Sequence, residues 1–103
     1  MTVDEIIGFL RDRVANVACD GVDGLLVIME RLGFKCREAS AGHRVFTHPE
    51  LTKITNRQFL SHSINCDHKT RRPMPKHYVK DTMKLIEKYA EQLKEINGEK
   101  SNV

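Results

Sequence analysis

The chain has 103 residues, of which 40% are hydrophobic and 30% are charged, and this balance predicts one folded domain rather than a disordered chain. No apolar run approaches the roughly 20 residues of a membrane-spanning helix, and no basic stretch followed by an apolar one marks a secretory signal. We therefore expect a cytoplasmic protein without a membrane partner. The three cysteines, Cys19, Cys36 and Cys66, are odd in number and widely spaced, so we expect reduced thiols.

The net charge of +3 is distributed unevenly. Residues 1–33 carry three basic and six acidic side chains, residues 34–80 carry ten and three, and residues 81–103 carry four and five. The central segment therefore has a net charge of +7. Phosphate backbones are common partners of such a positive field, but a solvated surface or a docking face for an acidic protein is also consistent with it.

Two amphipathic helices are predicted in the first third of the chain. Thr2 and Glu5 form a capping-box pattern, and apolar residues recur at helical spacing over residues 2–17. A second helix is predicted within residues 20–32, because Gly33 suits the left-handed conformation that often follows a helix.

Alternating patterns then predict three strands, at residues 34–38, 43–48 and 59–66, with a polar loop over residues 50–57. The helical period returns over residues 76–96. The fold class is therefore α+β, with a three-stranded antiparallel sheet and helices on one face. The residues expected in the core are apolar members of these elements: Leu25, Ile28, Met29, Leu32, Val45, Ile64, Val79, Met83 and Ile86.

The run from Arg31 to Arg37, followed by Ala41 to Pro49, resembles the HicA toxin family, in which Leu-Gly-Phe precedes Gly-Ser-His and His-Pro. The segment Met74–Lys80 is similar to the start of that family's last helix. The resemblance covers residues 25–93 and implies a double-stranded-RNA-binding-like fold, α-β-β-β-α. Residues 1–19 would be an additional N-terminal helix, residues 20–96 the HicA-like core, and residues 97–103 a frayed tail of this single domain. This chain has Ala41-Gly42 where the family has Gly-Ser.

The resemblance implies the toxin of a type II toxin–antitoxin system, a metal-independent endoribonuclease that cleaves mRNA and is neutralised by a HicB-like antitoxin. The catalytic histidine of the family corresponds to His43. An imidazole suits proton transfer to or from RNA because its pKa lies near neutrality. His62 is a possible second imidazole, since the third strand can place it near the second.

Basic residues are expected to hold phosphates without reading bases. Arg37 and Arg44 flank the predicted hairpin, and four more cations lie in the connector that leads into the last helix: Lys69, Arg71, Arg72 and Lys76. The N-terminus of a helix favours the binding of an anion such as phosphate, because its backbone N–H groups point toward the anion. The cluster of His62, Cys66 and His68 lacks a standard zinc spacing, so we expect no metal and no cofactor. The alternatives are a non-catalytic RNA-binding module of the same fold and a protein-interaction domain.

Overall fold

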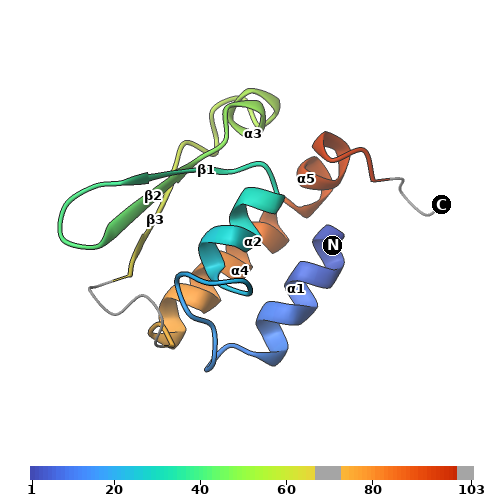
Figure 1. Ribbon diagram of the computed structural model, residues 1–103. Coiled ribbons are helices and arrows are strands. Elements are labelled where there is room, and N and C mark those ends of the chain that lie inside the picture. The colour runs from blue at the N-terminus through green and yellow to red at the C-terminus, as the bar shows by residue number, and fades with distance from the viewer. Residues whose placement is uncertain (67–72, 100–103) are drawn as a thin grey trace.

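The computed structural model describes residues 1–66 and 73–99 as an α+β fold (Figure 1). Its helices are α1 (Val3–Asp12), α2 (Leu25–Arg31), α3 (Pro49–Ile54), α4 (Lys76–Lys88) and α5 (Ala90–Ile96). The strands β1 (Lys35–Glu38), β2 (His43–Thr47) and β3 (His62–Asn65) form one antiparallel sheet in the order β1-β2-β3. The predicted fold class and three strands are thus confirmed. Among the described residues, no helix has the length and hydrophobicity needed to cross a membrane.

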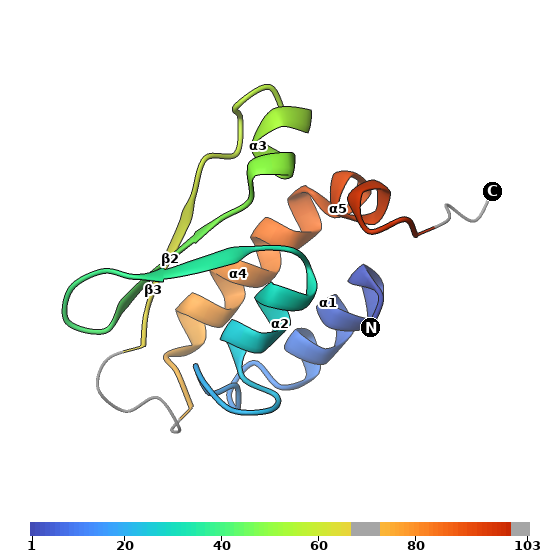
Figure 2. The ribbon, with the colours of Figure 1, turned by 45° about the horizontal axis from the view of Figure 1, so that its top comes forward.

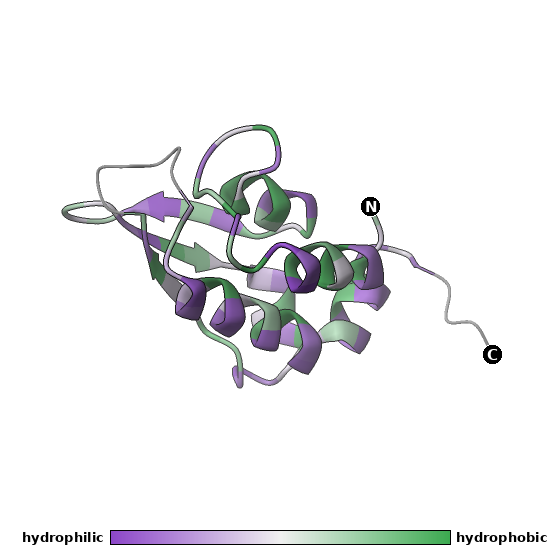
Figure 3. Cartoon of the chain, turned by 90° about the horizontal axis from the view of Figure 1, so that it is seen from below, coloured by the Kyte–Doolittle hydropathy of each residue, from purple (hydrophilic) through white to green (hydrophobic). Residues whose placement is uncertain are grey.

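The core lies between the sheet and the helices. α2 and α4 pack beneath the same side of the sheet, and α1 packs against α4 and α5 (Figures 1 and 2). Phe46 of β2 and Ile64 of β3 are 0% and 1% exposed, because they face these helices. Hydrophobic residues gather where the helices meet the sheet, and hydrophilic residues lie on the outer surfaces of the helices (Figure 3).

Seven of the nine predicted core residues are buried, but Val45 and Met83 are only partly buried. Val45 is paired with Arg37 and Ser63, which are both exposed, so the alternation of the strand turns Val45 away from the helices. Met83 packs against the core from its margin.

The first helix is shorter than the prediction of residues 2–17. α1 ends at Asp12, and residues 17–19 instead accept backbone hydrogen bonds from Met74 and from the first residues of α2. Met74 N–H donates to Val17 O at 2.8 Å, and Leu25 N–H donates to Ala18 O at 2.9 Å. These tertiary hydrogen bonds outweigh the local helical pattern of the apolar residues.

The prediction of a loop over residues 50–57 was wrong, because residues 49–54 form α3. Pro49 occupies the start of the helix, where a missing N–H costs nothing. His48 caps it: Nδ1 accepts from Leu51 N–H at 3.2 Å, so Nε2 carries the proton and donates to Leu32 O at 3.1 Å. His48 is 3% exposed and joins α3 to the end of α2.

The predicted single helix over residues 76–96 is divided at Tyr89, whose φ of −109° and ψ of 21° are not helical. The Tyr89 ring is buried and packs edge-on against Phe59, with 5.8 Å between centroids. This contact holds Tyr89 in place between α4 and α5. After Tyr89 the chain changes direction, and α5 packs against α3 and α1.

Two of the three cysteines form a disulfide, which corrects the expectation of reduced thiols. Cys19 and Cys66 are bonded, with their Cα atoms 5.6 Å apart, and both are buried. The bond joins the segment before α2 to the residue that follows β3. Cys36 on β1 is a free, exposed cysteine.

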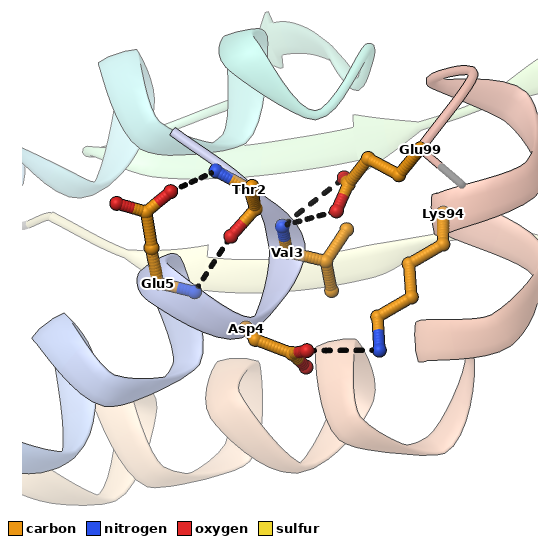
Figure 4. Close-up of polar contacts among 6 residues, drawn as sticks. All are labelled: Thr2, Val3, Asp4, Glu5, Lys94 and Glu99. Carbon is orange, nitrogen blue, oxygen red and sulfur yellow. Dashed lines mark hydrogen bonds and ion pairs between the residues drawn. The ribbon is translucent and has the colours of Figure 1, made fainter. Parts of the chain in front are cut away.

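The start of α1 is fixed by side chains from both ends of the chain (Figure 4). The predicted capping box is confirmed, since Glu5 N–H donates to Thr2 Oγ1 and Thr2 N–H donates to Glu5 Oε1. Val3 N–H donates to the Glu99 carboxylate at 3.1 and 3.2 Å, and Lys94 pairs with Asp4 at 3.0 Å. The Glu99 side chain thus contacts the start of α1, and residues 100–103 of the predicted frayed tail lie outside the described residues.

Candidate functional site

A tight turn places His43 at the first position of β2. His43 N–H donates to Ser40 O at 3.0 Å, and His43 O accepts from Ala39 N–H at 2.9 Å. The two central residues of the turn, Ala41 and Gly42, have φ values of 51° and 85°, as in a type I′ turn. Both backbone groups of His43 are therefore fixed while its side chain is exposed.

His43 belongs to the side of the sheet that faces away from α2 and α4, which we call the open sheet face. The register and the alternation of the strands assign seven side chains to this face: Lys35, Arg37, His43, Val45, Thr47, Ser63 and Asn65. Four of them are exposed and the other three are half-buried. This surface is polar and carries two cations: Arg37 is the nearer to His43 in register, and Lys35 lies two residues farther along β1.

Arg37 is the described cation that the sheet brings closest to His43 in register. It pairs with Val45, two residues along β2 from His43, so the two side chains are diagonal neighbours. Diagonal neighbours in an antiparallel sheet lie about 7–8 Å apart, which is within reach of an arginine side chain. The same phosphate can therefore contact both groups.

The end of β3 lies beside His43. Asn65 is the cross-strand partner of His43, and Cys66 N–H donates to Gly42 O at 2.9 Å. The chain thus leaves the sheet next to His43 and continues into the basic connector. The predicted cations Lys69, Arg71 and Arg72 lie outside the described residues. Lys76 is the exposed first residue of α4.

Arg44 does not lie on the same face of the sheet as His43. As the next residue of β2, it points to the opposite side of the sheet, where it pairs with Ile64 in register. Its Nη1 lies 3.1 Å from Glu38 Oε1, an ion pair without a hydrogen bond. Arg44 is therefore occupied by Glu38 and partly buried rather than presented beside the imidazole.

His62 also lies on the opposite face, so the structure does not bring the two predicted imidazoles together. Thr82 Oγ1 donates to Tyr78 O at 2.8 Å, so it accepts from His62 Nε2, also at 2.8 Å. The ring stacks on Phe46 with 6.4 Å between centroids. Burial lowers the pKa of His62, and nearby Asp81 opposes this only in part. These contacts describe a neutral histidine that joins the sheet to α4.

Other reactive groups offer no rival centre among the described residues. Partial burial raises the pKa of the Cys36 thiol, which disfavours the nucleophilic thiolate. No three His, Cys, Asp or Glu side chains within residues 1–66 and 73–99 are grouped to hold a metal. In the cluster of His62, Cys66 and His68, Cys66 is in the disulfide and His68 lies outside the described residues.

Lys35 is a site residue that the sequence prediction did not select. The alternation of the first predicted strand places Lys35 on the same face as Arg37, and this pattern could have identified Lys35 as a site residue.

Comparisons of the chain with protein-family models, curated proteins and solved structures give no significant match.

Proposed function

We propose that this protein is a metal-independent endoribonuclease that cleaves mRNA as the toxin of a type II toxin–antitoxin pair, with His43 as its general base or acid. The observation that supports this proposal most is the placement of His43. It is exposed, held by two backbone hydrogen bonds, and lies on the same face of the sheet as Lys35 and Arg37.

The chemistry needs RNA, these side chains and a proton donor for the leaving oxygen. His43 removes the proton from a ribose 2′-hydroxyl, and the 2′-oxygen attacks the adjacent phosphorus. The bond to the 5′-oxygen breaks, and that oxygen takes a proton from water or a second acid. Arg37, the diagonal neighbour of His43, stabilises the negative charge that gathers on the phosphorane oxygens. Lys35 lies two residues farther along β1 and contacts a neighbouring phosphate of the RNA in this proposal. The products are a cyclic phosphate and a free 5′-hydroxyl.

The resemblance to the HicA family supports proposals about the fold type, the cellular location and the protein partner. We propose that residues 20–96 form a double-stranded-RNA-binding-like core, that the protein acts in the cytoplasm, and that a HicB-like antitoxin neutralises it. Arg37, Lys76 and the connector cations Lys69, Arg71 and Arg72 hold phosphates in this proposal. Such contacts position an RNA strand without reading its sequence.

The decisive experiment compares wild-type protein with His43→Ala on labelled RNA in the presence of a chelator. We expect cleavage by the wild-type protein and a loss of at least about a hundredfold for His43→Ala, with RNA binding retained. His77→Ala is the matched control, since His77 is exposed in the first turn of α4 and is not on the open sheet face. Equal cleavage by wild-type protein and His43→Ala would refute the catalytic role.

One observation favours a non-catalytic RNA-binding module as the second candidate. The structure separates His62 from His43, so the described residues supply one imidazole to the open sheet face rather than two. This alternative predicts salt-sensitive RNA binding without cleavage products in the same assay.

A further inference from the structure

β1 forms an outer edge of the sheet with no strand on its other side among the described residues. All four of its residues are exposed, and Figure 2 shows β1 running along the outside of the sheet above α2. An outer strand of this kind presents unpaired N–H and C=O groups to which another extended chain can bind.

The register identifies the backbone groups that are presented. Ala39 N–H donates to His43 O, so Ala39 is turned toward β2. Backbone direction alternates along a strand, so Arg37 and Lys35, paired with Val45 and Thr47, are also turned toward β2. The N–H and C=O groups of Cys36 and Glu38 therefore point outward. An added antiparallel strand would form its hydrogen bonds with these two residues.

Two side chains of this edge, Lys35 and Arg37, are positive and have no carboxylate partner among the described residues. In the part of the chain that the structure describes, the ion pairs join Arg44 to Glu38 and Lys94 to Asp4, whereas Lys35 and Arg37 have none. Both cations project on the open sheet face, two residues apart on the strand. A strand that binds here would place two of its own side chains, also two residues apart, opposite them.

A second copy of β1 is a poor occupant. Antiparallel self-pairing through the outward groups of Cys36 and Glu38 allows three registers. The first places Lys35 opposite Arg37 of the other copy, the second places Arg37 opposite Arg37, and the third places Glu38 opposite Glu38. Like charges directly opposite one another destabilise a strand pair, so all three registers disfavour a dimer.

An RNA phosphate is also a poor occupant of the edge itself, because the outward carbonyl oxygens of Cys36 and Glu38 are acceptors to which a phosphate cannot donate. We propose that the β1 edge binds an extended segment of a protein partner carrying an acidic residue, any residue, and a second acidic residue. This segment adds to the sheet as an antiparallel strand, with its carboxylates opposite Lys35 and Arg37. Because these cations share the open sheet face with His43, the bound segment competes with a polyanion for that face.

The test uses a peptide of about ten residues with Glu-Val-Glu at its centre and threonines on both sides. Isotope-labelled full-length protein is titrated with it, and backbone amides are followed by NMR. We expect the largest shifts and slowed hydrogen exchange at Cys36 and Glu38, since their N–H groups gain partners. Lys35→Glu combined with Arg37→Glu should weaken binding about tenfold, because two attractive cross-strand pairs become repulsive.

The matched control combines Lys53→Glu with Lys84→Glu, which changes the net charge equally at exposed positions outside the sheet. This control should bind the Glu-Val-Glu peptide as tightly as wild-type protein does. A Lys-Val-Lys peptide should bind more tightly to the double variant Lys35→Glu, Arg37→Glu than to wild-type protein. Equal weakening in both double variants, shifts confined to other elements, or no binding at millimolar peptide would each overturn the proposal. The titration is repeated with His43→Ala, where we expect unchanged binding, so the result does not depend on whether the protein cleaves RNA.

Discussion

His43 and His62 lie on neighbouring strands of one sheet but project from opposite faces. His43 is paired with Asn65 and is exposed, whereas His62 is paired with Phe46 and its Nε2 lies 2.8 Å from Thr82 Oγ1. Two imidazoles that are close in the topology therefore have separate roles. His43 is available to a ligand, and His62 is part of the contact between β3 and α4.

The stability of the protein should depend on pH through His62. Burial lowers its pKa from 6.5, so the folded state binds the proton less readily than the unfolded state. The free energy of unfolding is then highest above the unfolded pKa and falls as the pH drops below about 6.5 toward the lowered folded pKa. His62→Gln keeps an N–H donor for Thr82 but does not titrate, so urea unfolding between about pH 7.5 and about pH 5.5 should show a weaker pH dependence.

The exposed His77 provides the control for this prediction, and His77→Gln should retain the wild-type pH dependence. If His62→Gln and wild-type protein lose stability equally on acidification, the buried imidazole is not the group responsible.

The turn before His43 should tolerate a stabilising substitution. Ala41 has a φ of 51°, in the left-handed region, where a non-glycine residue pays roughly 1 kcal/mol or more of strain. Asparagine is favoured there, and Asn-Gly is the preferred pair for a type I′ turn. Ala41→Asn should therefore raise the free energy of unfolding by about 1 kcal/mol, measured by urea denaturation. Ala39→Asn, at a position with ordinary backbone, should give no such gain.

His48 should be required for stability and not for chemistry. His48→Ala removes the cap of α3 and leaves Leu32 O and Leu51 N–H without their partner in a buried position. The combined loss should be about 3 kcal/mol in the free energy of unfolding. His48→Asn can still cap Leu51 but is too short to reach Leu32, so it should lose about half as much. A His48→Ala protein as stable as wild type would contradict this role.

Local patterns predicted the strands but could not show which side of the sheet is buried. β2 carries an apolar residue on each face, Val45 and Phe46, and alternation alone does not choose between them. The structure buries Phe46 against the helices, and this choice places Arg44 on the buried side and His43 on the open one. The missed α3 has a different origin, because its N-cap is a histidine, which is not among the residues that usually mark a helix start. The distant Leu32 O accepts from the other ring nitrogen of His48, and the sequence pattern does not reveal this contact.

The disulfide could not be predicted from spacing, because Cys19 and Cys66 are 47 residues apart and only the tertiary fold brings them together. Closing a loop of this length should stabilise the folded state by about 4 kcal/mol through the entropy of the unfolded chain. Reduction of wild-type protein, or Cys19→Ser combined with Cys66→Ser, should therefore lower the free energy of unfolding by up to that amount. Cys36→Ser should leave it unchanged, because Cys36 is a free, exposed cysteine. Thiol titration of the unfolded, unreduced protein should detect Cys36 alone, and detection of all three thiols would show that the bond does not form.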